Sequence, residues 1–584
     1  MYKGKVPLIL SLILFVVILI PIYYLILGIS FFKEIGAASF TFQQFFFSKE
    51  AAKILENTFV YAGGHAVFAV LLATVYAWIV ARTDVRGKRI LGLLPILGLT
   101  MPLEVKAFAW VFIFNPRNGI ANVLLQFLFG HNAPSFDIYS MTGLIFAGSM
   151  GAIPLAYLII MPAMQSLDSS LEEASRVAGK GALKTFFSVS ARLVWPAILI
   201  GFILLLIGGI DNFDYPLIIG QPARISVLST EIYFYTSDRV PPSYGDAAVV
   251  SSLLVMIALA LVTLYILFTR RAYKYQALSS SATAKTVQRL GKWRPIALLI
   301  CLVILFFEFA LPLGTLVLLS MTTVYIPGGS VPWTFNFPAA YQQLTQLAGF
   351  YTSVTTTLEF ALFAGAGATV IGAVLSYTAL RTRSRGARLV EYISSVPLAF
   401  PGIVYGVALF WTFLLAPGVN VIYGTVWPLV ISLIFIRIPY TTRIISSNLI
   451  QISDQLEEAS QVSGARLTRT FRKVLMPLMR GGLINGFVYA FVNSMRELGG
   501  VVLLSTAAAP AFTTILLNFY GSHALVENVL SAGSVVLTLM IMAVLGALFI
   551  IERLWGGRVT RRARKNGGRE AAPAPLVLTE PVAP

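Results

Sequence analysis

Long apolar runs separated by short polar stretches are the dominant pattern of this 584-residue chain. A helix that crosses a bilayer needs roughly 20 consecutive, mostly apolar residues. Runs of about this length cover residues 7–28, 58–82, 90–115, 139–164, 193–219, 247–269, 295–320, 354–380, 389–415, 424–450, 478–506 and 529–552. The first run is too long for the apolar core of a typical signal peptide, so we expect it to be retained. The pattern predicts an all-α membrane protein with about 12 transmembrane helices.

The charged residues are few, and they are unevenly distributed between the loops. Only 12% of the residues are charged and 57% are hydrophobic, whereas soluble domains contain about 25% charged residues. Lys and Arg gather in alternate loops and are absent from 321–353 and 507–528. Because cytoplasmic loops collect Lys and Arg, this alternation predicts a multi-pass membrane protein with both termini cytoplasmic. The net charge of +18 is then explained by these loops, and no nucleic-acid partner is expected.

Cysteine and histidine provide little material for a metal site. Cys301 is the only cysteine, and His65, His131 and His523 are far apart in the sequence. A disulfide framework and a Cys-based metal cage are therefore excluded, and we predict no metal site in this chain.

A polar segment occurs twice. LEEASRVAG begins at Leu171 and LEEASQVSG at Leu456, 285 positions later, whereas ARTDVRG and LRTRSRG, which end at Gly87 and Gly386, are 299 apart. The change of offset places fourteen additional residues in the first half, in an outer loop after NPRNG. The repetition predicts two parallel six-helix repeats. The predicted organisation is a first transmembrane domain (1–269), a basic cytoplasmic linker (270–294), a second transmembrane domain (295–555) and a disordered cytoplasmic tail (556–584).

Both repeated segments have the pattern of a short helix–turn–helix. Asp168 and Asp454 are candidate N-caps, and Gly179 and Gly464 allow a left-handed residue in the turn. The charge alternation places both segments on the cytoplasmic side. A projection that occurs once per half suggests a partner that also comes in two copies, although a surface connector without a partner has the same pattern.

These two segments resemble the cytoplasmic loop of permease subunits of ATP-binding-cassette (ABC) importers with the type I fold. That loop reads E-A-A, three residues, G, nine residues, then I-x-L-P; Pro477 ends the second match, but Arg192 replaces this proline in the first. The resemblance implies that each loop is a coupling helix docked on one of two copies of an ATPase subunit. The coupling residues that it implies are Glu172, Glu173, Ala174, Ser175, Gly179, Glu457, Glu458, Ala459, Ser460 and Gly464.

The chain has no G-x-x-x-x-G-K-[ST] phosphate loop, so we expect ATP and Mg to bind to the partner ATPase. We predict a transport subunit, not an enzyme, with no catalytic residues and no bound cofactor. The resemblance further implies a location in the bacterial inner membrane, with an extracytoplasmic solute-binding protein and membrane lipid as partners.

Two further segments resemble the ferric iron transport permeases, which often fuse both halves in one chain. The matching residues are Phe213, Pro216, Gly220, Pro222, Arg496, Glu497 and Leu498. The resemblance implies ferric iron as the solute, with thiamine, phosphonates and polyamines as alternatives from related fused permeases.

Ionisable residues within the predicted spans are candidates for the solute path, because buried charge in a membrane is costly and usually functional. With the 285 offset, Asp211 aligns with Arg496 and Asn212 with Glu497. We therefore expect Asp211, Asp214, Arg496 and Glu497 to lie together around the central path. They form either a gate or path, or a structural ion-pair clasp of Asp211 or Asp214 with Arg496. Further charges within the predicted spans are Glu104, Lys106 and Arg437.

A rival class is a 12-helix secondary transporter driven by an ion gradient. Parallel halves suit such a transporter, but it has no need of a repeated polar loop. A membrane enzyme is a third possibility, yet no nucleophile–base set or His-rich cluster appears in the sequence.

Overall fold

The structure is a computed structural model that describes most of the chain. The described residues are 9, 12–13, 16, 19–27, 42–130, 132–276, 287–322, 335–381, 390, 394–521 and 527–566. Apart from loops, these residues are helical, with two isolated β-bridges that join Thr83 to Gln288 and Thr322 to Phe335. The predicted all-α class is therefore confirmed for this part of the chain.

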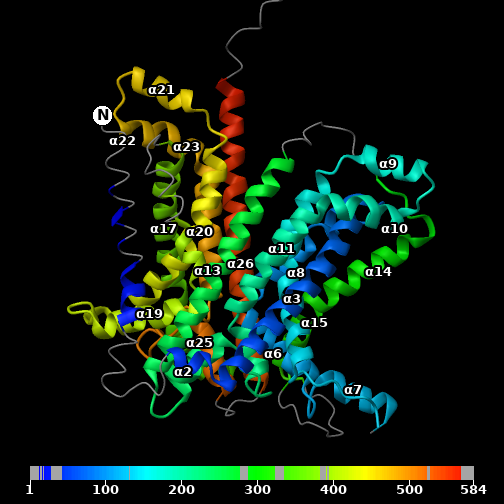
Figure 1. The fold of residues 1–584 in the computed structure, drawn as a ribbon, viewed down its shortest axis with the longest axis vertical. Helices are drawn as coiled ribbons and strands as arrows, with labels where there is room; N and C mark the ends of the chain where they lie inside the picture. Colours follow the sequence, from blue (N-terminus) through cyan, green and yellow to red (C-terminus); the bar gives the residue numbers. More distant parts are fainter. Residues whose placement is uncertain are drawn as a thin grey trace, which may run out of the picture.

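The helices fall into two sets with the same order along the chain (Figure 1). The first set is α2 (Phe42–Phe46), α3 (Lys49–Arg82), α4 (Lys88–Leu91), α5 (Leu94–Leu97), α6 (Leu103–Phe114), α7 (Ile120–Phe129), α8 (Met141–Gln165), α9 (Ser169–Val177), α10 (Ala182–Thr185), α11 (Ala191–Asp211), α12 (Leu228–Tyr233) and α13 (Tyr244–Gln276). The second set is α14 (Arg294–Leu305), α15 (Leu311–Ser320), α16 (Phe337–Gln346), α17 (Phe350–Arg381), α19 (Gly402–Leu415), α20 (Trp427–Leu449), α21 (Asp454–Val462), α22 (Leu467–Thr470), α23 (Met476–Leu478), α24 (Arg480–Met495), α25 (Phe512–Gly521) and α26 (Glu527–Asn566).

Fewer membrane spans than predicted are found among the described residues. Eight helical segments among the described residues are long and apolar enough to cross a membrane, and counting each of two bent helix pairs as one span gives up to ten. This number is below the expected 12 or so, and nine of the 22 residues of the first predicted span, 7–28, lie outside the described residues. The tail predicted from 556 begins as part of α26, and 567–584 also lie outside them.

Two predicted straight spans are interrupted at equivalent prolines. Lys88–Thr100 and Leu103–Phe114 are bent by 95° relative to each other, and α19 starts only after Pro401. Proline lacks an N–H and disfavours helical backbone in the preceding residue. Met101 and Phe400, which precede the two prolines, are accordingly extended. The predictions of continuous helices over 90–115 and 389–415 are therefore wrong at these breaks.

Two other predicted spans end earlier than expected, again at equivalent positions. The helix α11 ends at Asp211 and α24 at Met495, not at 219 and 506. Gly499 and Gly500 follow the end of α24 closely, and glycine is unfavourable in a helix. The early ends place the predicted path residues at helix termini, where backbone groups are free to bond side chains.

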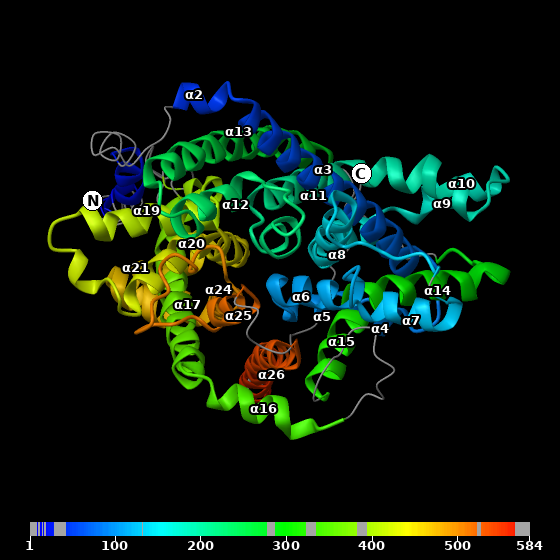
Figure 2. The same cartoon turned by 90° about the horizontal axis from the view of Figure 1, so that it is seen from below.

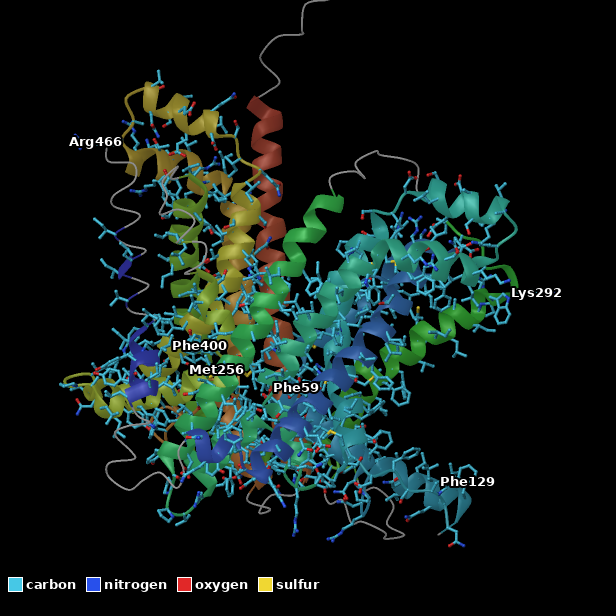
Figure 3. The ribbon with its side chains drawn as sticks, in the orientation of Figure 1. Phe59, Phe129, Met256, Lys292, Phe400 and Arg466 are labelled. Atoms are coloured by element: carbon cyan, nitrogen blue, oxygen red, sulfur yellow. The ribbon has the colours of Figure 1, made fainter. Side chains whose placement is uncertain are left out.

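Corresponding helices of the two sets pack in the same way. The helices α3, α8 and α11 contact one another, as do α17, α20 and α24. Both α9 and α21 lie at one end of the molecule, which we call the loop end, whereas α7 and α25 lie toward the opposite end (Figure 1). Arg466 and Phe129 mark these two ends in Figure 3. Equivalent helices therefore run in the same direction, as a parallel repeat requires.

Each set contributes a helix to the packing of the other. The helix α15 contacts α6, α14 contacts α3, and α13 contacts α19. Figure 2 shows the two bundles side by side, with α6 and α25 between them. The halves thus form one continuous helical unit, and their boundary is lined by helices from both.

The additional residues of the first half form most of an extra helix. The connection from α6 to α8 contains α7, whereas the connection from α19 to α20 contains only a 3₁₀ turn, Asn420–Ile422. The insertion lies opposite the loop end (Figure 1), in the loop predicted to receive it.

Candidate translocation cavity and coupling loops

A polar cavity of about 170 Å³ lies between the two halves. It is lined by the ends of α11 and α24 and by the first residues of α6 and α19. All four predicted path residues line it, together with one further cation. These residues are Asp211, Asp214, Arg437, Arg496 and Glu497. The expectation that the path residues lie together is thereby met; their role is taken up below.

The cavity is built from equivalent positions of the two repeats. Leu103 and Gly402, which differ by 299, both line it, and so do Asp211 and Arg496, which differ by 285. The cavity therefore lies on the axis that relates the halves. Its chemistry is not symmetric, since the first half contributes Asp211 and Asp214 where the second has Arg496 and Gly499.

Asp211 and Arg496 each reach across to the other half. The carboxylate of Asp211 accepts a hydrogen bond of 2.9 Å from the backbone N–H of Gly402, the first residue of α19. The guanidinium of Arg496 donates a bond of 2.5 Å to the carbonyl oxygen of Leu99, in the turn before α6. The two equivalent positions thus bond the two equivalent helix breaks. We call these two bonds the crossed contacts.

Arg437 is paired with Glu497 at 2.5 Å and also donates to the carbonyl oxygen of Asn493. Within the described ranges, no ion pair joins Arg496 to Asp211 or Asp214. The anticipated aspartate–arginine clasp is therefore not formed. The physical reason is that proline breaks leave a backbone donor at Gly402 and a backbone acceptor at Leu99, which satisfy the two side chains.

A buried ion pair joins the halves away from the cavity. Lys106 on α6 lies 3.2 Å from Glu308, with side chains 1% and 0% exposed. Glu308 was missed at the level of sequence, although it is the one acidic residue in the run 295–320. Nearby on α6, Glu104 is buried, and neither of its carboxylate oxygens has a hydrogen-bond partner within the described part of the chain. No group of three or more His, Cys, Asp or Glu in that part could hold a metal ion.

The repeated loops have the same backbone geometry. The turn residues Gly179 and Gly464 have φ angles of 79° and 80°, a region that favours glycine. In the first loop the hydroxyl groups of Ser175 and Thr185 lie 3.1 Å apart. In the second, those of Ser460 and Thr470 lie 2.9 Å apart. Each hydroxyl pair ties α9 or α21 to the helix that follows it.

The helix caps differ from the prediction in one loop. Asp168 caps α9, because its side chain accepts the backbone N–H of Ser170 at 2.9 Å. The N-cap of α21 is Ser453 and not Asp454. Asp454 is the first residue of that helix, where the positive end of the helix dipole stabilises a carboxylate. It also forms an ion pair with Arg381.

The first glutamate of each loop is buried against its own half. Glu172 pairs with Arg82 at 2.5 Å and accepts a bond of 2.6 Å from the hydroxyl group of Ser190. Glu457 accepts a bond of 2.7 Å from the hydroxyl group of Tyr377. Glu172 and Glu457 therefore anchor the loops to α3 and α17 and do not face outward.

The outer surface of each loop carries a small apolar face. Val177 and Val462 are 91% and 90% exposed, and exposed alanines stand three residues before them. Residues three apart share one side of a helix. The face of the first loop is Leu171, Ala174 and Val177, and that of the second is Leu456, Ala459 and Val462. Of the other predicted coupling residues, Glu458, Gly179 and Gly464 are exposed and Glu173 is half-buried, whereas Ser175 is buried and Ser460 half-buried.

Comparison with known proteins identifies the family. The model of the family described as binding-protein-dependent transport system inner membrane component matches residues 69–275 and 368–561. The chain belongs to this family. It is a multi-pass inner-membrane permease and a transport subunit, and the predicted class of ABC importer permease is confirmed. The two matched regions, one in each half, agree with a duplicated permease fold.

Individual relatives share about a quarter of their residues with the chain. The ferric transport system permease protein FbpB of Actinobacillus pleuropneumoniae is 25% identical over 469 residues, covering 77% of this chain and 64% of that protein. A putative ferric transport system permease protein, FbpB 1 of Haemophilus influenzae, is 27% identical, covering 76% of this chain and 68% of that protein. The chain thus spans about two thirds of the length of these two relatives.

Shorter permeases match parts of the chain. The sulfate transport system permease protein CysT of Salmonella typhimurium is 28% identical and covers 44% of this chain and 88% of its own length. A crystal structure of a bacterial ABC transporter involved in the import of the acidic polysaccharide alginate aligns with a TM-score of 0.37 and 16% identity. That alignment covers 45% of this chain and 96% of the other.

Proposed function

We propose that this chain translocates ferric iron inward through an ABC importer, driven by ATP hydrolysis in two copies of a partner ATPase subunit. The observation that carries the proposal is the pair of loops with matching outward apolar faces on one end of the molecule. An extracytoplasmic solute-binding protein delivers the solute to the opposite end. In this orientation the loop end is cytoplasmic, in keeping with its Lys and Arg content.

The apolar faces provide a way for mechanical work to enter. Val177 and Val462 project from short helices that a hydroxyl–hydroxyl hydrogen bond ties to the next helix. Burial of these apolar side chains against a partner is favourable. Behind each face, Glu172 and Glu457 tie the loop to α3 and α17. A displacement of either ATPase subunit is then transmitted as rigid-body movement of one half.

The crossed contacts serve as the gate. Rotation of the halves breaks the bonds from Asp211 to Gly402 and from Arg496 to Leu99 together, because each bond spans the boundary between the halves. Hydrogen bonds to charged groups contribute roughly 1.5–3 kcal/mol each. Two bonds of this strength hold the cavity closed at rest, yet they can be broken by a conformational change.

Ferric iron as the solute is supported by the names of two relatives and by the chemistry of the cavity. Hard metal ions prefer oxygen ligands, and Asp211 and Asp214 provide carboxylates at its wall. The described part of the chain has no cluster of three ligands, which suits brief passage of an ion more than its storage.

The docking proposal is tested by placing charge on each apolar face. We expect Val177→Glu and Val462→Glu each to abolish co-purification of the ATPase and ATP-dependent uptake of radiolabelled ferric iron in proteoliposomes. The matched control is Phe129→Glu, which adds the same charge to an exposed apolar residue of α7 at the opposite end and should leave ATPase binding intact. Normal ATPase binding and uptake in both valine variants would refute the docking faces.

Solute identity is tested separately with the unaltered chain. ATP-driven uptake of ferric iron that is not reduced by excess sulfate, thiamine or polyamine supports iron. Uptake of one of those solutes in place of iron would retain the importer and reject iron as its cargo.

A further inference from the structure

A second cavity, of about 790 Å³, lies at the loop end beside the first loop only. Its walls come from the end of α3, from the turn after α9 and from residues 287–289 of the predicted linker. We call it the linker cavity. Lys292, which follows the lining residues 287–289 in the sequence, lies on the same side of the molecule as α9 and α10 (Figure 3).

The linker wall is held in place by backbone hydrogen bonds. Gln288 donates its backbone N–H to the carbonyl oxygen of Arg82 at 2.8 Å, and its own carbonyl oxygen accepts the N–H of Asp84 at 3.1 Å. The side chain of Asp84 in turn accepts the backbone N–H of Leu290 at 2.9 Å. The linker is thereby joined to the end of α3 through the isolated β-bridge between Thr83 and Gln288, so the linker cavity has a defined wall.

Three cations and one acid line this cavity. The cations are Arg176, Lys180 and Arg289, and the acid is Asp84. Asp84 is already engaged by Leu290, and it lies 4.0 Å from Arg294. The remaining charge at the walls is positive, which favours an anionic ligand. The volume is within the range of roughly 300–1,000 Å³ that small-molecule sites occupy.

Two buried polar groups at these walls have no partner within the described part of the chain. The Gln288 side chain is 1% exposed, and neither its amide nitrogen nor its amide oxygen is hydrogen-bonded. The Nε of Arg176 is also buried without a hydrogen bond, and its guanidinium lies 3.9 Å from Glu173. Unsatisfied buried polar groups are costly and rare, so a ligand that bonds them is expected.

Two of the three cations have no counterpart at the equivalent loop positions of the second half. The positions equivalent to Arg176 and Lys180 are Gln461 and Ala465. Two identical ATPase subunits would need the same contact residues on both loops. The apolar faces occur on both loops, but these two cations do not. The charge of the linker cavity is therefore not explained by ATPase docking.

We propose that the linker cavity binds a phosphate-bearing ligand, and that this ligand influences only the first loop. Arginine and lysine side chains are suited to bind phosphate oxygens. Binding is communicated to α9 because the carbonyl oxygen of Arg82 bonds Gln288 while its guanidinium holds Glu172. The phosphate group belongs either to a soluble metabolite or to the headgroup of an anionic phospholipid.

Calorimetry on the full-length chain tests the proposal without any ATPase or solute, so its outcome is independent of the transport role. The chain is placed in nanodiscs of phosphatidylcholine and titrated with inorganic pyrophosphate. We expect saturable binding at one site, weakened at least tenfold when Arg176→Gln and Lys180→Ala introduce the residues of the second half. The matched control is Lys184→Ala, which removes a cation of the same loop outside the linker cavity and should leave the affinity unchanged.

Nanodiscs that contain phosphatidylglycerol distinguish the two sources of the phosphate. Unchanged pyrophosphate affinity in them indicates a soluble ligand, whereas competitive weakening in the unaltered chain indicates a lipid headgroup. Absence of saturable binding in phosphatidylcholine would overturn the proposal. Equal affinity in the double variant, or an equal loss in the Lys184→Ala control, would also overturn it, because either result reduces the effect to general attraction by the basic surface.

Discussion

The two coupling loops have the same shape but are anchored by different chemistry. In the first, Arg82 forms a buried ion pair with Glu172; in the second, Tyr377 donates its hydroxyl to Glu457. Arg381, the counterpart of Arg82, instead pairs with Asp454. Both arginines also bond a carbonyl oxygen at the end of the preceding helix, that of Leu167 or Ile452. The repeats thus agree in backbone geometry and outward face, while the buried contacts behind the faces differ.

One aromatic substitution explains the difference. The position equivalent to Tyr377 is Trp78, and both rings pack against the corresponding phenylalanine of the loop, Phe186 or Phe471. The indole N–H of Trp78 has no hydrogen-bond partner within the described residues, and the first glutamate is bound by arginine instead. Where tyrosine is present, the arginine pairs with Asp454 at the start of α21.

Removal of Arg82 should have the largest effect on this comparison. Arg82→Met leaves Glu172 buried without its cation, which costs about 3–5 kcal/mol, and we expect α9 to lose its protection from hydrogen exchange. Arg381→Met should increase exchange in α21 less, because Glu457 retains Tyr377 and the partner that is lost, Asp454, is solvent-exposed. The double variant Arg82→Met, Glu172→Leu should recover part of the protection. Equal exchange in the Arg82 and Arg381 variants would show that the ion pair is not the anchor.

Loss of the Tyr377 hydroxyl should have an intermediate effect confined to the second loop. Tyr377→Phe keeps the ring against Phe471 and removes one hydrogen bond to a carboxylate, worth roughly 1.5–3 kcal/mol. Faster exchange is expected in α21 and unchanged exchange in α9, which serves as the internal control. An effect of the same size on both loops would contradict separate anchoring.

The hydroxyl pairs should give the smallest effect, and an equal one. Ser175→Ala and Ser460→Ala each leave a buried threonine hydroxyl without its partner, at a cost of about 1 kcal/mol. We expect similar, modest increases in exchange in α9 and α21, since this contact is the same in both loops. A clear difference between the two variants would mean that the loops also differ in their turns.

Several features of the site could be predicted from sequence alone. The repeated LEEAS segments, the glycine turns and the 285 offset led to matching loops and to the grouping of Asp211 with Arg496 at one cavity. The partners of these charges could not be predicted. Asp211 bonds Gly402 and Arg496 bonds Leu99 only because helix breaks at Pro102 and Pro401 expose backbone groups at that depth.

Apolar run length and repeat spacing determined that the chain is helical, embedded in a membrane and duplicated, because these properties follow from local composition and periodicity. Tertiary packing decided which helices bend, which charges meet and which loop the linker joins. These depend on groups hundreds of residues apart, such as Lys106 with Glu308 and Gln288 with Arg82. Their pairing is chosen by the competition for buried hydrogen-bond partners, which becomes defined only when the helices are packed.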